Sequence, residues 1–467
     1  MNFVSLTFWV SFAALLVLYW AIRRKGFQNI LLLAASYVFY GWANPWYAVM
    51  LGLSTTGDYF LSLGIKRNPA RARVFLVLSL LLNLGVLGFF KYYNFFNAGL
   101  TGILTSLGLQ GDFFLANILL PAGLSFYTLK KLGYVLDVSR GVLEPTEDFI
   151  SFALYVSFFP QIVSGPIDRF QKLFPQFQQA RIWKMDNFYS AWPLLIMGFF
   201  KKIVVADTVK IIVDRVFELE EPSKLLLIAA GLGFTLEILA DFSAYTDISR
   251  GISYLLGFET TENFNRPYLS LTPTDFWNRW HITLSNWLRD YIFFPLRRAL
   301  LKSRFKQTEW LVLSVPPIAA MFASGLWHGA GWTFVVWGLY YGVLIAAYQA
   351  AGIRGNWQPT NKIKLVLAWL VMFAFIVFGW LIFRASSLGW LVNVILHSVW
   401  INGRNDLVVV IITLSMTLFY AVPLTLKIFL DRLSSQHFAF SIYYALLTLG
   451  IIIFVSSASP DFIYFQF

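Results

Sequence analysis

The chain of 467 residues is 58% hydrophobic and 19% aromatic, and only 13% of its residues are charged. Soluble globular domains carry roughly 25% charged residues, so this composition excludes an ordinary soluble protein and predicts a membrane protein. The net charge of +12 suits a multipass protein, whose Lys and Arg residues collect in cytoplasmic loops, and we expect no nucleic-acid partner.

The chain contains no cysteine, which excludes disulfide bonds, thiolate metal sites and a cysteine nucleophile. It also lacks an H-E-x-x-H pair, the signature of a zinc hydrolase. We therefore expect no bound metal.

Apolar stretches long enough to approach a bilayer crossing recur along the whole chain. Several are short or contain Gly and Pro, so we expect about 11–13 transmembrane or re-entrant helices in one all-α membrane domain, residues 1–467. The predicted spans are 5–22, 28–42, 46–64, 74–95, 150–164, 190–208, 224–240, 310–326, 331–349, 363–383, 389–400, 407–426 and 438–457.

Positive charges at the ends of these spans predict the topology. Arg23, Arg24 and Lys25 follow the first span, so the positive-inside rule places them in the cytoplasm and the N-terminus outside. The order is the reverse of that in a cleaved signal peptide. Lys427 and Arg432 precede the last span, so we expect the C-terminus outside as well, which requires an even number of crossings.

Residues 258–309 form the larger polar interruption, and its segment 270–298 holds the informative residues. The sequence predicts a helix from Thr274 or Asp275 onward. Three polar residues would then share one face at intervals of four: His281, Ser285 and Arg289. An interfacial helix with a tryptophan belt is the structural alternative.

Basic residues are concentrated around this segment, and such a surface suits a phosphate-bearing partner. Coenzyme A and the phosphopantetheine arm of an acidic carrier protein are candidates. The basic residues are Arg279, Arg289, Arg297, Arg298, Lys302, Arg304 and Lys306.

His328 lies within an apolar run from Leu311 to Ala347, where an ionisable residue is costly and points to function. A neutral imidazole is suited to act as a general base at neutral pH. Gly325, Gly329 and Gly331 would let a backbone or a substrate approach it. The alternative is a structural histidine bonded to a carbonyl group, as we expect for His397 and His437.

Two motifs, PTDFWNRWHITLSNWLRDYIFFPL (273–296) and ASGLWHGAGWTFVVWG (323–338), carry a family resemblance. They resemble the membrane-bound O-acyltransferase superfamily. Four other stretches are similar to its bacterial branch, the alginate O-acetylation family: Phe158 to Pro166, DFSAYTDISRG (241–251), NFNRPY (263–268) and FRASSL (383–388).

The resemblance implies an irregular ring of helices around a thin central tunnel, which joins a cytoplasmic acyl donor to an acceptor outside. It implies that His328 is the buried catalytic histidine and His281 the donor-side histidine. Five further residues are expected on the tunnel or donor side: Trp327, Asn286, Arg289, Arg297 and Arg298. The chain departs from the family pattern after Leu296 and at Leu129-Lys130-Lys131, which leaves donor contacts open.

We therefore expect an O-acyltransferase in a bacterial plasma membrane that moves an acyl group, in our interpretation acetyl, to an exported or cell-wall polysaccharide such as alginate, cellulose or peptidoglycan. The resemblance implies an extracytoplasmic hydrolase-like partner. We expect acetyl-CoA or an acyl carrier as the donor, and we expect no bound cofactor. The alternatives are D-alanyl transfer toward teichoic acid and, from another class, a transporter or flippase of lipid-linked sugars.

The chain ends in DFIYFQF, residues 461–467. An aromatic anchor at the outer interface is one interpretation. The other is an acyl relay, because similar tails recur in family members that work with hydrolase-like partners. Tyr464 is the matching residue, and Phe462, Phe465 and Phe467 would dock the tail near His328.

Overall fold

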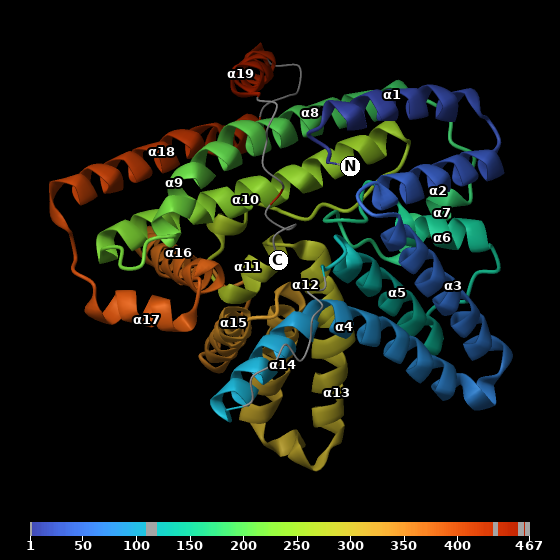
Figure 1. The fold of residues 1–467 in the computed structure, drawn as a ribbon, viewed down its shortest axis with the longest axis horizontal. Coiled ribbons are helices and arrows are strands. Elements are labelled where there is room, and N and C mark those ends of the chain that lie inside the picture. Colours follow the sequence, from blue (N-terminus) through green and yellow to red (C-terminus); the bar gives the residue numbers. More distant parts are fainter. Residues whose placement is uncertain (1, 109–118, 433–437, 456–461, 463–467) are drawn as a thin grey trace. The chain divides into compact units, whose positions relative to one another are not determined.

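The computed structural model describes residues 2–108, 119–432, 438–455 and 462, and every regular element within these ranges is helical (Figure 1). Two helical segments are π-helical, Phe200–Ala206 and Arg289–Phe293. The α-helices are α1 Leu6–Ala21, α2 Lys25–Gly41, α3 Pro45–Arg67, α4 Ala72–Ser106, α5 Leu124–Ser139, α6 Phe149–Ser157, α7 Phe170–Phe177, α8 Met185–Phe199, α9 Asp207–Phe217, α10 Lys224–Leu255, α11 Pro273–Arg279, α12 Ile282–Leu288, α13 Phe294–Lys302, α14 Glu309–His328, α15 Trp332–Ala350, α16 Lys362–Arg384, α17 Leu388–His397, α18 Gly403–Leu430 and α19 Phe438–Phe454.

Among these residues, six helices are long and apolar enough to cross a bilayer: α4 with the turn before it, α10, α14, α15, α16 and α18. Shorter apolar helices, such as α1 and α19, accompany them. The prediction of an all-α multipass protein is confirmed, whereas the number of crossings stays a prediction. The stretch 150–164 is helical only to Ser157, and its non-helical remainder is buried, so the prediction of one helix over this span is wrong.

The Cα packing divides the chain into two compact units. Unit 1 comprises Met1–Ala191 with Ser249–Thr261, and unit 2 comprises Trp192–Ile248 with Glu262–Phe467. The single membrane domain stays a prediction.

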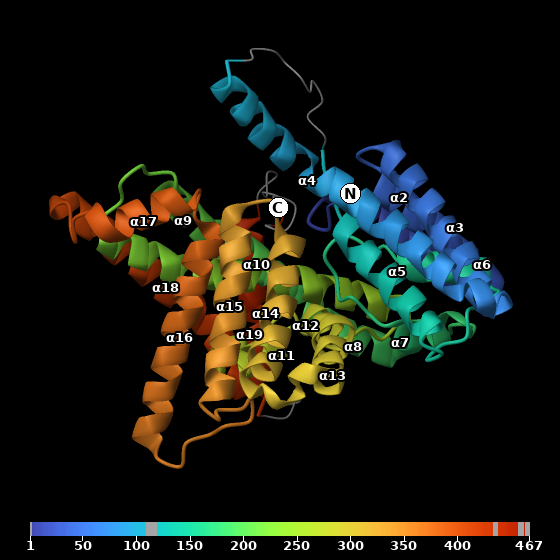
Figure 2. The same cartoon turned by 90° about the horizontal axis from the view of Figure 1, so that it is seen from below.

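In unit 1, α3, α4 and α5 lie side by side (Figures 1 and 2) and enclose a buried ion pair. Lys131 Nζ lies 3.2 Å from Asp58 Oδ2, and neither side chain is more than 1% exposed. Ser79 and Asn83 of α4 donate to the same carboxylate at 2.5 Å and 2.8 Å. The carboxylate is thus fully paired, which is the condition under which a buried charge is tolerated.

Lys130, beside Lys131, is also in the interior. Its Nζ donates to Gln161 Oε1 at 3.1 Å, and Gln161 Nε2 donates to Asp168 Oδ2 at 2.6 Å. Thr261 donates to the other oxygen of Asp168. The departure from the family pattern at Lys130 and Lys131 therefore lies inside unit 1, where both side chains are paired with other residues of the chain, and donor or loop contacts at this position stay a prediction.

Replacing Lys131 by Met should destabilise the protein by about 3–5 kcal/mol, because Asp58 stays buried without its counter-ion. The double variant Asp58→Asn/Lys131→Met should recover more than half of this loss, since the amide oxygen still accepts from Ser79 and Asn83. Thermal unfolding in detergent measures both. A double variant no more stable than Lys131→Met would contradict the ion-pair account.

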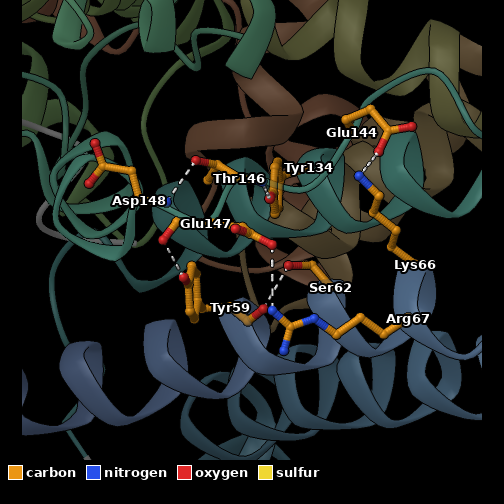
Figure 3. A network of polar contacts seen from close by, with 9 residues as sticks. All are labelled: Tyr59, Ser62, Lys66, Arg67, Tyr134, Glu144, Thr146, Glu147 and Asp148. Atoms are coloured by element: carbon orange, nitrogen blue, oxygen red, sulfur yellow. Dashed lines mark hydrogen bonds and ion pairs between the residues drawn. The ribbon is translucent and has the colours of Figure 1, made fainter.

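Lys66→Met is a matched control, because Lys66 forms an exposed ion pair with Glu144 (Figure 3). Around it, Arg67 lies 3.5 Å from Glu147, and Tyr59 donates to the Glu147 carbonyl oxygen at 2.7 Å. These pairs link the end of α3 to the segment that precedes α6. Exposed ion pairs contribute about 0–1 kcal/mol, so Lys66→Met should have little effect.

Candidate active site

His328 is the last residue of α14 in unit 2, and its side chain is buried. Three aromatic rings surround the imidazole at near-perpendicular angles. The ring centroids of Trp327, Trp337 and Phe383 lie 4.9, 5.0 and 5.4 Å from it. An intramembrane histidine is thus held in one position by packing on several sides.

Helices α14 and α15 lie side by side (Figures 1 and 2), and glycines on either side of His328 in the sequence allow them to approach closely. A Cβ atom on Gly325 would lie 2.3 Å from the Phe334 carbonyl oxygen. A Cβ atom on Gly329 would lie 2.1 Å from the Phe334 ring. The space at these two glycines is therefore filled by α15, so they position His328 through helix packing and give no room there for a substrate.

His281 lies at a break between α11 and α12, with a left-handed backbone at φ 42°. The prediction of one continuous helix with His281, Ser285 and Arg289 on one face is therefore wrong. The reason is a non-helical segment, residues 263–265, which forms the backbone hydrogen bonds at the break: Asn265 N–H donates to the Arg279 carbonyl and Ile282 N–H donates to the Asn263 carbonyl.

Asn263 also fixes the tautomer of His281. Its Oδ1 accepts from the Thr283 N–H at 3.1 Å and from the Thr283 hydroxyl at 2.9 Å. The same oxygen lies 3.3 Å from His281 Nδ1, which must therefore carry the hydrogen. His281 Nε2 is thus the acceptor nitrogen, suited to receive a hydrogen bond.

One indole connects the two histidines. The ring centroid of Trp327 lies 5.9 Å from that of His281 and 4.9 Å from that of His328. Phe242 of α10 contacts His281 from another side at 4.8 Å. Residues 47 positions apart in the sequence thus contact the same indole ring.

Two buried donors near His328 have no hydrogen-bond partner among the described residues: the Ser324 hydroxyl and the Trp337 indole N–H. Ser324 lies one turn before His328 on α14. Helical hydroxyls elsewhere in the chain donate to the carbonyl four residues earlier, as Ser36 does to Leu32 at 2.8 Å. Both donors are therefore available to a polar atom of a bound substrate.

The predicted donor-side residues make local contacts. Arg289 is exposed and donates to Asp290 at 3.3 Å, and Arg298 is exposed and donates to the Phe294 carbonyl at 3.3 Å. Arg297 and Asn286 are half-buried. The helices that carry these four residues pack against α14, the helix that ends at His328. Tyr464 lies outside the described residues.

Several residues of this site had no role in our sequence analysis, among them Phe242, Asn263 and Phe383. These three lie in the family-like motifs at 241–251, 263–268 and 383–388. The motifs were therefore the available signal, but the contacts of each residue depend on partners far away in the sequence.

Burial lowers the pKa of His281 to about 3. The unfolded chain binds a proton below about pH 6.5 while the folded chain does not, so stability should fall as pH drops from 6.5 toward 3, by up to about 1.4 kcal/mol per pH unit. Thermal unfolding of wild type and His281→Asn across this range measures the difference, with exposed His397→Asn as control. If the stability of wild type and of His281→Asn depended on pH in the same way, the assigned role of His281 would be contradicted.

A family model for the membrane-bound O-acyltransferases (MBOAT) matches residues 145–392, which include both histidines. The chain belongs to the membrane-bound O-acyltransferase family. It is thus a membrane protein and an O-acyltransferase, which confirms the resemblance and the prediction of an enzyme and leaves the transporter alternative without support.

Members of this family from several bacteria are similar to the chain. It is 37% identical over 393 residues to "Probable alginate O-acetylase AlgI" of Pseudomonas aeruginosa, covering 83% of this chain and 73% of that protein. It is 32% identical over 431 residues to "Peptidoglycan O-acetyltransferase" of Helicobacter pylori, covering 84% and 78%. "Teichoic acid D-alanyltransferase" of Bacillus subtilis is 28% identical over 278 residues, covering 58% and 70%.

Proposed function

We propose that this membrane-bound O-acyltransferase moves an acetyl group from a cytoplasmic thioester to a hydroxyl of an exported or cell-wall polysaccharide. The observation that carries the proposal is the pair of buried histidines joined by Trp327. The acetyl group and the acceptor class come from the relatives named for alginate and peptidoglycan acetylation.

His328 would act as the general base. The acceptor hydroxyl attacks the thioester carbonyl carbon, the C–S bond breaks, and the proton passes from the hydroxyl through His328 to the departing thiolate. Ser324 and Trp337 would donate to the carbonyl oxygen, where negative charge develops. His281, neutral and with Nε2 as an acceptor, would bind the donor side of the substrate.

The donor would be acetyl-CoA or an acyl carrier with a phosphopantetheine arm. Arg289, Arg297 and Arg298 would attract its phosphates, with Asn286 and Trp327 beside the path to the histidines. No resident cofactor is needed, because the chemistry is base catalysis on a thioester.

The acceptor side would face outward from a bacterial plasma membrane, with both termini outside. Tyr464 would take the acetyl group first, and an extracytoplasmic hydrolase-like partner would pass it to the glycan. A tyrosyl ester stays activated because a phenol, with a pKa of about 10, is a better leaving group than an aliphatic alcohol.

D-alanyl transfer toward teichoic acid is the second candidate, since D-alanyltransferases are also similar to the chain. Deleting the gene and restoring it separates the two. Mild alkali should release less acetate, and unchanged D-alanine, from the envelope polysaccharide of the deletion strain. Loss of D-alanine with unchanged acetate would overturn the acetyl proposal.

The donor can be tested with the purified chain in vesicles. Release of the thiol from acetyl-CoA is measured with a thiol reagent, and the protein gives no background because it has no cysteine. Thiol release from acetyl-CoA, as the acetyl group moves to Tyr464, indicates that donor, whereas release from an acetylated carrier protein alone indicates the other.

A further inference from the structure

Phe462, near the C-terminus, is inserted into the interior of unit 2. Its side chain is only 1% exposed. Its ring lies 5.2 Å from that of Tyr245 at an interplanar angle of 85°. The ammonium group of Lys202 lies 4.6 Å from the centroid of the same ring. One aromatic residue of the tail thus contacts both an aromatic residue and a cation.

Lys202 is also held by two carboxylates. Its ammonium group lies 2.8 Å from Asp207 Oδ1 and 2.9 Å from Asp241 Oδ1, and its side chain is 1% exposed. It belongs to the π-helical segment Phe200–Ala206. The π-helix is rare in proteins, and where it occurs it is frequently part of a functional site. A buried cation fixed by two carboxylates presents a constant charge to the face of an aromatic ring.

Helix α10 connects this contact to the histidines. Asp241 and Tyr245 lie four residues apart and so share one face of the helix. Phe242, the residue after Asp241, contacts His281 with ring centroids 4.8 Å apart. Tyr245, which contacts Phe462, and Phe242, which contacts His281, are therefore three residues apart on one helix.

We propose that Lys202, Asp241 and Tyr245 form a binding site for the aromatic C-terminal tail of the chain, with the phenyl ring of Phe462 as its ligand. We call these three residues the tail site. The inference rests on the proposed function in one respect: the tail site serves acyl transfer by holding the tail where Tyr464 can receive the acyl group. Tyr464 follows Phe462 by two residues, a reach of about 7 Å in an extended chain.

A membrane anchor would place Phe462 differently. Aromatic anchors lie at the protein surface, at the level of the lipid headgroups. Phe462 instead lies against Lys202, whose buried ammonium group is paired with buried Asp241 and half-buried Asp207, which is a protein interior and not a lipid environment. The contact with Lys202 also requires an aromatic ring, whereas lipid would accept any apolar side chain.

Cross-linking of the full-length protein tests the tail site without an activity assay. The photoreactive amino acid p-benzoylphenylalanine replaces Phe462, and mass spectrometry maps its products after irradiation in membranes. The tail site predicts cross-links to the π-helical segment Phe200–Ala206 or to residues 241–245 of α10. The matched control is the same replacement at Phe454, which is exposed at the end of α19. Cross-links from position 462 only to lipid or to other segments would overturn the proposal.

Activity variants test the role of the tail site. Phe462→Ala should lower the rate of glycan acetylation at saturating donor about 10-fold or more and leave the KM for the donor within about 2-fold, since only presentation of the tail is lost. Phe462→Trp keeps an aromatic ring and should retain most of the rate, as should Phe454→Ala. A peptide of residues 456–467, added to Phe462→Ala, should restore transfer, while the same peptide with Ala at 462 should not. Wild-type activity of Phe462→Ala would overturn the role.

The outcomes separate this inference from the proposed function. If the cross-links form as expected but Tyr464→Phe remains active, the tail site stands and the tyrosyl relay fails. If His328→Ala removes activity but Phe462→Ala does not, the proposed chemistry stands and the role of the tail site fails.

Discussion

Replacing His328 by alanine should lower the rate of acyl transfer by about 10²–10⁴-fold, the usual contribution of a positioned general base. The imidazole is buried and packed against Trp327, Trp337 and Phe383, and none of these three side chains can accept a proton at neutral pH. The acetyl content of the glycan in cells, and thiol release from the donor in vesicles, measure the loss.

Removing a packed side chain also creates a cavity, so a second variant is needed. His328→Gln fills much of the space and keeps hydrogen-bonding atoms, but it cannot accept a proton at neutral pH. It should fold normally and be as inactive as His328→Ala. His397→Ala is the matched control, because His397 is exposed on α17. Wild-type transfer by His328→Gln at normal abundance would refute the assignment.

Hydrophobic pattern predicted the long helices well. The predicted spans 310–326, 331–349 and 363–383 correspond to α14, α15 and α16 to within a few residues. Each is apolar over a length that only a helix can satisfy in a bilayer, so local composition decides the structure. The glycines beside His328 predicted a close approach of the backbone, and the structure shows this approach between α14 and α15 at Gly325 and Gly329.

The break at His281 could not be predicted from local pattern, because residues 273–298 contain good helix signals throughout. The backbone of residues 263–265 forms hydrogen bonds with Arg279 and Ile282 on the two sides of the break. The side chain of Asn263 also bonds the imidazole of His281. Such a contact has no periodicity in the sequence. The family-like motif at 263–268 was the only hint that this segment matters.

The positions of charged residues in the interior were equally hidden. Lys130 and Lys131 stood out as charges, and a basic pair in a membrane protein suggests an exposed or donor-binding surface. Their partners, Gln161 and Asp58, lie 31 and 73 residues away in the sequence. Only the fold shows that the charges are paired inside unit 1. Lys202 and Asp241 follow the same rule in unit 2.

Replacing Tyr464 by phenylalanine should abolish acetylation of the glycan. The change removes a single hydroxyl, so the protein should remain folded and abundant. In the proposed relay, Tyr464 gives its phenolic proton to His328, bonds to the acetyl carbon and releases the donor thiol. The partner then takes the acetyl group and the phenol is restored. Phenylalanine cannot form the ester, so the acetyl group has no carrier to the outside.

Two measurements distinguish this relay from an anchoring role. Mass spectrometry of the wild-type chain, incubated with donor in the absence of the partner, should find an acetyl group on the peptide that contains Tyr464. Tyr464→Phe should lose this product and glycan acetylation together, while Tyr189→Phe, at an exposed tyrosine of α8, should lose neither. Full glycan acetylation by Tyr464→Phe would leave Tyr464 as an aromatic anchor and require the acetyl group to pass from the donor directly to the partner. Phe462 would then hold a tail that positions the partner, because its contacts with Lys202 and Tyr245 do not depend on the hydroxyl of Tyr464.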